Sequence, residues 1–179
     1  PMLSAATDTS SMMMNVFEGL LAFDETGAFL PALAESYEIS NDNLTYTFHL
    51  KQGVSFHDGN AFTSADVKYT YEKLAGLSGG DALSSTIAAV LEKVVTPDDY
   101  TAVLTLKQMD AGFLSKCTVS VCENGYEDNA TLPIGTGPYK FVEYVVGQKV
   151  VLEKNENYTT SQARMPSVDR VEFVIMTDE

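Results

Sequence analysis

The chain has 179 residues, of which 45% are hydrophobic and 10% aromatic, and a formal net charge of −14 at pH 7. A domain of this length buries roughly 70% of the surface that its unfolded chain exposes, so the composition supports a packed core and excludes a disordered polymer. The negative charge repels phosphate backbones, which argues against a nucleic-acid partner. Charged or polar residues interrupt every apolar run well before the ~20 residues that a membrane-spanning helix needs.

The first elements expected along the chain are a helix and a hairpin. Amphipathic spacing predicts a helix over residues 11–21. Residues 34–50 are predicted to form a hairpin, because the turn-forming cluster Asn41-Asp42-Asn43 separates two alternating stretches. In the second stretch, residues 44–50, apolar and polar side chains alternate, which indicates an antiparallel strand with one covered face and one wetter face. Asp58-Gly59 marks the next turn.

The next helix carries signals at both ends. Thr63 is placed to cap its first amides, and Asp66 is placed to reach back, which is a capping-box arrangement. We expect the helix to run to about Leu74 and to end at Gly76, because glycine tolerates the left-handed conformation that closes many helices. A glycine-rich break precedes a second, shorter helix over residues 82–89.

The remaining segments alternate in the manner of strands. Residues 91–96 and 100–107 are expected to pair across a turn that contains proline and two aspartates. Residues 139–146 and 149–154 are expected to pair across Gly-Gln, and residues 168–176 to add a further strand. The predicted fold class is therefore α+β, a mostly antiparallel sheet with flanking helices.

Several short motifs occur in a fixed order: Phe17-Glu18-Gly19-Leu20-Leu21 with Phe23-Asp24, Pro31-Ala32-Leu33-Ala34-Glu35-Ser36-Tyr37, Leu44-Thr45-Tyr46-Thr47-Phe48-His49-Leu50, Gly53-Val54-Ser55-Phe56-His57-Asp58-Gly59, and Pro133-Ile134-Gly135-Thr136-Gly137-Pro138-Tyr139. Each motif alone is weak, but the ordered set spans most of the chain and is specific. With it, the sequence resembles the peptide-binding class of bacterial extracellular solute-binding proteins, which feed ATP-driven importers.

The resemblance implies a protein much longer than this chain, with two lobes that close over a ligand held in the cleft between them. Residues 1–179 are then expected to be an N-terminal-lobe fragment, truncated at both ends, of a periplasmic-binding-protein-like fold. The implied function is to bind short peptides outside the cytoplasm and to deliver them to the membrane permease of an ABC importer. The protein would reside in the periplasm, or at the cell surface as a lipid-anchored protein, and would be neither an enzyme nor dependent on a cofactor.

The resemblance also places Ala5, Ala6, Thr7 and Asp8 at the cleft wall as ligand-binding residues. They are small or polar, as the close approach of a ligand backbone requires; an ordinary exposed terminus is the alternative. Relatives of the same build carry nickel chelates, haem, glutathione or sugars, so the ligand stays open between a peptide and another small solute.

Other candidate chemistry has a structural explanation. Gly135-Thr136-Gly137 lacks the helix start that a phosphate loop needs, since Pro138 and a strand pattern follow, so we interpret it as a turn. The two histidines, His49 and His57, have no accompanying metal-ligand motif. We expect His49 on the wetter strand face, and His57 bonded to backbone beside its turn. No metal site is predicted.

The two cysteines, Cys117 and Cys122, leave two alternatives. An even count in an exported protein suggests a disulfide, which would contribute about 2 kcal/mol by closing so short a loop. The alternative is a pair of reduced thiols in a buried loop, and the bridge ranks slightly ahead.

Two other function classes remain open. In the first, the chain is a small acidic domain that binds another protein through its charged face. In the second, it is a hydrolase, although no Ser/His/Asp or Cys/His arrangement stands out in the sequence. A nucleophile beside a base in a pocket would favour the hydrolase.

Overall fold

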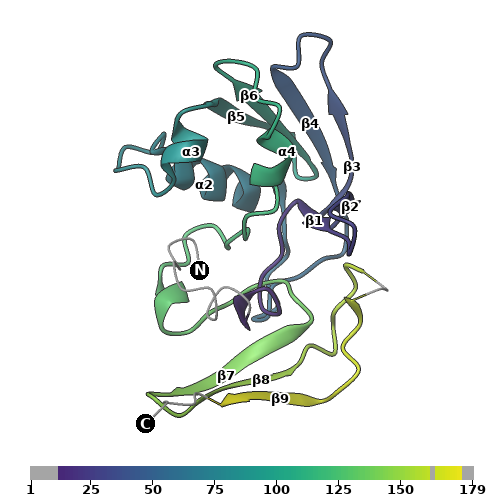
Figure 1. The fold of residues 1–179 in the computed structure, drawn as a ribbon, viewed down its shortest axis with the longest axis vertical. Helices are drawn as coiled ribbons and strands as arrows, with labels where there is room; N and C mark the ends of the chain where they lie inside the picture. The colour runs from purple at the N-terminus through teal and green to yellow at the C-terminus, as the bar shows by residue number, and fades with distance from the viewer. Residues whose placement is uncertain (1–11, 162–163, 175–179) are drawn as a thin grey trace.

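The computed structural model describes residues 12–161 and 164–174 (Figure 1). Its strand pairs are antiparallel, which confirms the predicted α+β class. The strands form a two-stranded, a four-stranded and a three-stranded sheet: β1 (Leu21–Phe23) with β2 (Phe29–Pro31); β3 (Ala34–Ile39), β4 (Thr45–Leu50), β6 (Thr101–Leu106) and β5 (Leu91–Asp98), in that spatial order; and β7 (Tyr139–Val145), β8 (Lys149–Lys154) and β9 (Arg170–Val174), also in that order.

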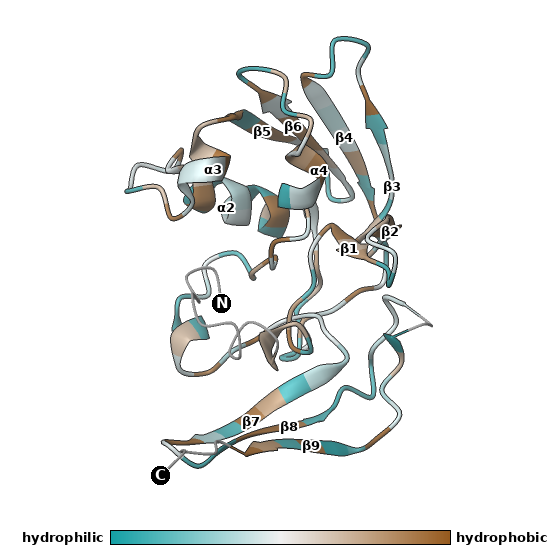
Figure 2. Ribbon diagram, viewed as in Figure 1, coloured by the Kyte–Doolittle hydropathy of each residue, from teal (hydrophilic) through white to brown (hydrophobic). Residues whose placement is uncertain are grey.

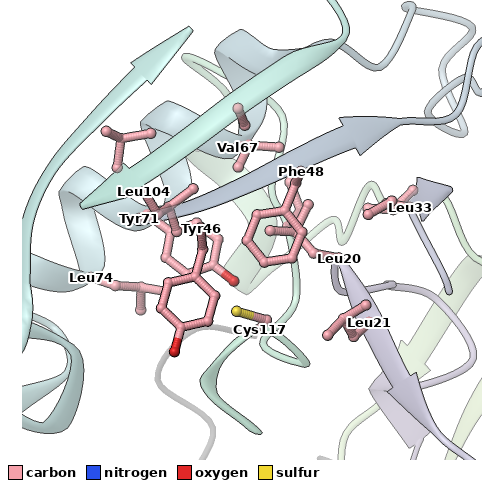
Figure 3. Packing of buried hydrophobic residues seen from close by; sticks show 14 of the residues in the cluster. Leu20, Leu21, Leu33, Tyr46, Phe48, Val67, Tyr71, Leu74, Leu104 and Cys117 are labelled. Atoms are coloured by element: carbon pink, nitrogen blue, oxygen red, sulfur yellow. The ribbon is translucent and has the colours of Figure 1, made fainter. Parts of the chain in front are cut away.

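The four-stranded sheet carries the larger core. Along β4 the apolar side chains Tyr46, Phe48 and Leu50 are buried while the residues between them are half-buried, so the predicted two-faced strand is confirmed. Helix α2 (Ser64–Ala75) packs against β5 and β6. Figure 3 shows Phe48 in one cluster with Tyr71 of this helix. Three short helical elements are also present: α3 (Ser85–Ala88), α4 (Phe113–Lys116) and the 3-10 turn η1 (Asp128–Ala130).

Helix α2 has the predicted ends. The backbone amide of Thr63 donates to Asp66 Oδ2 at 2.7 Å, which is the returning half of the capping box. Gly76 closes the helix at φ 72°, in the left-handed region. Helix α3 is shorter than predicted, and it begins where the Ser84 hydroxyl accepts the amide of Ile87. No helix within the described ranges has both the length and the apolarity to cross a membrane.

The predicted helix over residues 11–21 is wrong for its described part. Only residues 12–13 are helical, and a turn follows before β1 begins at Leu21. The reason is that other segments take the carbonyl oxygens a helix would use: those of Val16, Glu18 and Gly19 accept amides from Gly137 at 2.9 Å, Val121 at 2.8 Å and Leu33 at 3.0 Å. Tertiary hydrogen bonds therefore override the local amphipathic pattern.

The three-stranded sheet supports a second, smaller core. Hydrophilic and hydrophobic residues alternate over residues 170–173 of β9 (Figure 2). Three buried residues of this sheet, Tyr139, Val150 and Leu152, form a cluster with Val16, Phe17 and Cys122. The residues that enter this cluster from the N-terminal side show that residues 12–17 are packed against the sheet. In Figure 1 this purple segment lies between the four-stranded sheet with its helices and strands β7–β9.

Candidate functional site

The predicted ligand-binding residues Ala5, Ala6, Thr7 and Asp8 lie outside the described residues. The site is therefore built from the segment that leads to them, which the structure describes from Met12 onward. Contacts that hold this segment also hold the main chain that leads to the predicted ligand-binding residues.

A buried carboxylate organises the polar contacts of this region. The Glu18 side chain has no exposed surface, and it accepts hydrogen bonds from three side chains that are distant in sequence. Tyr158 donates its hydroxyl to Oε1 at 2.8 Å, Thr136 donates to Oε2 at 3.1 Å, and Arg164 Nη1 lies 3.3 Å from Oε1. We call these four residues the Glu18 cluster.

The electrostatics of the cluster are those of a desolvated but partnered acid. Burial raises the pKa of Glu18, while the Tyr158 hydrogen bond and the Arg164 charge act in the opposite direction. Burial also raises the pKa of Tyr158, so its hydroxyl stays a donor. Nearby, Lys51 Nζ donates to the Thr160 carbonyl at 2.6 Å, and burial lowers the pKa of that lysine. The cluster therefore holds charge by pairing, which makes it costly to break from one side.

The Gly135-Thr136-Gly137 turn docks onto the same segment through its main chain. The amide of Gly137 donates to the Val16 carbonyl at 2.9 Å, and the amide of Tyr139 donates to the Asn15 carbonyl at 3.0 Å. A Cβ at Gly135 would collide with the carbonyl oxygen of Val16, and one at Gly137 would lie 2.5 Å from that of Asn15. Strand β7 follows the turn, so it is a close-packing turn and not a phosphate loop.

His57 bonds to this turn with both ring nitrogens. The amide of Gly135 donates to Nδ1 at 3.3 Å, and Nε2 lies 2.9 Å from the Gly137 carbonyl, to which it can only donate. These partners require the neutral imidazole protonated on Nε2. Burial is the main cause that lowers the pKa of His57 to about 4. The predicted backbone role of this histidine is confirmed.

The cysteines are free thiols in the structure, so the disulfide favoured from the sequence is not formed there. The reason is that their side chains enter different cores. Cys117 packs in the larger cluster and donates to the Phe113 carbonyl at 3.4 Å, whereas Cys122 packs in the smaller one. Burial raises the pKa of Cys117 to about 12 and that of Cys122 to about 11.

The structure offers no metal centre within the described ranges, where no group of three or more His, Cys, Asp and Glu side chains could hold an ion. His49 lies on the less buried face of β4, with Nε2 3.4 Å from Glu38 Oε1. This position agrees with the expected strand face.

The Glu18 cluster was missed by the sequence analysis. One signal was present: Glu18 is the only charged residue in the apolar stretch from Val16 to Leu21, which is typical of a buried acid. No local signal connects it with Arg164, which lies 146 positions later. The partners of the acid are therefore visible only in the fold.

The comparisons with known proteins now identify the family. The sequence model of the bacterial extracellular solute-binding proteins, family 5 middle region, matches residues 28–179. The chain belongs to this family. Its members are solute-binding proteins and not enzymes, so the hydrolase alternative is wrong.

Individual relatives agree with this membership. The glutathione-binding protein GsiB of Pectobacterium atrosepticum is 30% identical over 179 residues, which cover 95% of this chain and 34% of GsiB. The DppA protein of Helicobacter pylori, solved with the peptide STSA, is similar with a TM-score of 0.86 and 28% identity, over 98% of this chain and 40% of DppA. The oligopeptide-binding protein AppA of Bacillus subtilis, solved with a nonapeptide, gives a TM-score of 0.84 and 29% identity, over 98% and 37%. The chain thus spans about a third of the length of the curated relatives it matches, such as the 34% covered in GsiB.

Proposed function

We propose that the full-length protein containing this chain is the extracytoplasmic binding component of an ABC importer, which captures short peptides between two lobes and delivers them to a membrane permease. The observation that carries the proposal is the family match over residues 28–179. The similarity to DppA and AppA, both solved with peptides, supports a peptide as the ligand.

In this proposal, residues 1–179 form the N-terminal part of the first lobe. The chain covers 40% of DppA, which supports its being one part of a longer protein. The second lobe and the rest of the first would come from the remaining length. Lobe closure over a ligand then requires a firm first lobe, and the two clusters of buried residues joined by the Glu18 cluster supply one.

We propose that Ala5, Ala6, Thr7 and Asp8 contribute to the cleft wall. The support is chemical: three of them lack a side chain larger than threonine, so a ligand main chain can approach closely and bond to their backbone. Recognition through the main chain would let the protein accept peptides of different sequence.

Calorimetry on the full-length protein tests both proposals. Mixed di- to pentapeptides should bind with micromolar or tighter affinity, and Ala6→Trp should weaken binding by filling the wall. The matched control is Asp81→Trp, because Asp81 is exposed in the loop after α2. If the wild type binds neither these peptides nor any of a set of other small solutes, the import proposal fails. If Ala6→Trp and Asp81→Trp weaken binding equally, the assignment of residues 5–8 to the cleft wall is contradicted.

The isolated 179-residue chain gives a second test. Because the proposal assigns about half of the cleft to the other lobe, the chain alone should bind peptides weakly or not at all. Micromolar binding by this chain would show that its own residues form a complete site, and the two-lobe proposal would then fail.

The proposed location is the periplasm or, with a lipid anchor, the outer face of the membrane. The family is described as extracellular, which supports a place outside the cytoplasm. When spheroplasts are prepared and treated with protease, the protein should be released or degraded while a cytoplasmic marker stays intact. Protection equal to that of the marker would contradict this location.

A further inference from the structure

The main chain at Met14 is held by a side chain 150 positions later. Arg164 donates from Nη2 to the Met14 carbonyl oxygen at 2.6 Å, and its Nη1 lies 3.3 Å from Glu18 Oε1. Both acceptors belong to the N-terminal segment: Met14 begins the turn at residues 14–16, and Glu18 follows it. A guanidinium suits such a pair of acceptors, because its donors diverge from a rigid plane.

Side-chain burial does not fix Met14. The side chain of Met14 is 66% exposed, whereas Val16 and Phe17 are buried and Met12 and Met13 pack partly against the smaller core. The segment is thus anchored by packing on both sides of Met14, and the described contact at Met14 itself is the guanidinium of Arg164. Without that hydrogen bond, the Met14 carbonyl group would have to bond to water instead.

The other end of the contact is rigid. The carboxylate that receives Nη1 is already bonded to Tyr158 and Thr136, and it has no exposed surface. A carboxylate held by these two partners has little freedom to move, so it fixes the position of the Arg164 guanidinium. The arginine side chain is 32% exposed, and its hydrogen bond to the Met14 carbonyl constrains the main chain there.

We propose that Arg164 is a positioning residue that fixes residues 12–17 and, through them, the proposed cleft wall at residues 5–8. Its effect on ligand affinity rests on the proposed function, whereas its effect on the segment does not. Arg164 need not touch the ligand, because its role is to hold the main chain from which the wall departs.

The first experiment measures the segment without any ligand. Amide hydrogen exchange in the full-length protein is compared for Arg164→Gln and for Arg170→Gln. Arg170 is the other arginine of the chain, and it pairs with Glu153 and Glu172 on the three-stranded sheet. The reporters are the amides of residues 15–17, which bond to the carbonyls of Met12 and Met13.

Arg164→Gln should speed exchange at residues 15–17 by about tenfold or more, as expected for loss of a charged hydrogen bond, while Arg170→Gln leaves them unchanged. Arg164→Lys should fall between, because an ammonium group lacks the planar fork. A merely structural role would instead speed exchange throughout the lobe in proportion to lost stability. That uniform result, or no change at residues 15–17, overturns the positioning role.

The second experiment measures peptide binding by calorimetry on the same variants. At a temperature well below the melting temperature of each variant, we expect Arg164→Gln to weaken affinity by about fivefold or more and Arg170→Gln to preserve it. If the wild type binds peptide and both variants match it, the link to the cleft wall is overturned while the proposed function stands. If the wild type binds nothing, the proposed function fails, and the exchange experiment still decides the positioning role.

Discussion

His57 predicts a loss of stability at mildly acidic pH. Its Nδ1 accepts the amide of Gly135 and its Nε2 donates to the carbonyl of Gly137. A proton added to Nδ1 removes the only lone pair available to that amide and places a charge in a desolvated site. The nearby charged groups act against each other, since Lys140 lowers the pKa and Asp58 raises it. Burial therefore decides the direction.

The magnitude follows from the shift of the pKa from 6.5 to about 4. Each unit corresponds to about 1.4 kcal/mol, so the full effect is about 3 kcal/mol. The unfolded chain binds the proton first, which means that stability is complete above pH 6.5 and is lost as the pH falls toward 4. Between pH 7 and pH 4.5 we expect a loss of about 2 kcal/mol from this residue alone.

The assay is urea unfolding of the 179-residue chain, followed by far-ultraviolet circular dichroism at both pH values. His57→Gln keeps an amide donor and an acceptor but does not titrate, so its stability should change by about 2 kcal/mol less than that of the wild type. Subtracting the stability change of His57→Gln from that of the wild type also removes the contribution of Glu18, whose raised pKa favours the folded state at low pH. Parallel pH dependence of the two proteins, or a His57 titration midpoint near 6.5 by NMR, would refute the reasoning.

Two further predictions concern buried groups. Because burial raises the pKa of Cys117 to about 12 and of Cys122 to about 11, neither thiol should react with a disulfide reagent at pH 8 in the native state. Both thiols should react in denaturant without reductant, and the absence of reactive thiols under that condition would contradict the free state. Gly137→Ala should destabilise the chain by about 2 kcal/mol or more, since its Cβ would lie 2.5 Å from the Asn15 carbonyl oxygen. Gly80→Ala is the control, as its Cβ would meet nothing within 4 Å, and equal unfolding midpoints in urea would count against the close packing.

Local signals predicted the elements whose causes are local. The capping box at Thr63, the left-handed Gly76 and the alternation along β4 are each written within a few residues, and each is found in the structure. The small sheet of β1 and β2 was not predicted, because three-residue strands carry almost no periodic signal.

The errors and omissions have a shared physical cause in contacts between distant segments. Residues 16–19 lose their helix to amides that arrive from residues 33, 121 and 137. Cys117 and Cys122 are close in sequence, yet they point into separate cores. The partners of Glu18 come from positions 136, 158 and 164. None of these choices can be made from a short window, since each depends on which segments the fold brings together.

Three of the five motifs that indicated the family meet at one junction in space. Glu18 belongs to the first motif, His57 to the fourth and Gly137 to the fifth, and hydrogen bonds connect the glycine turn with both the histidine and the N-terminal segment. A substitution at one of these residues therefore disturbs its contacts with the others. These residues hold distant segments of the chain together, so they identify the architecture and carry no information on ligand selectivity.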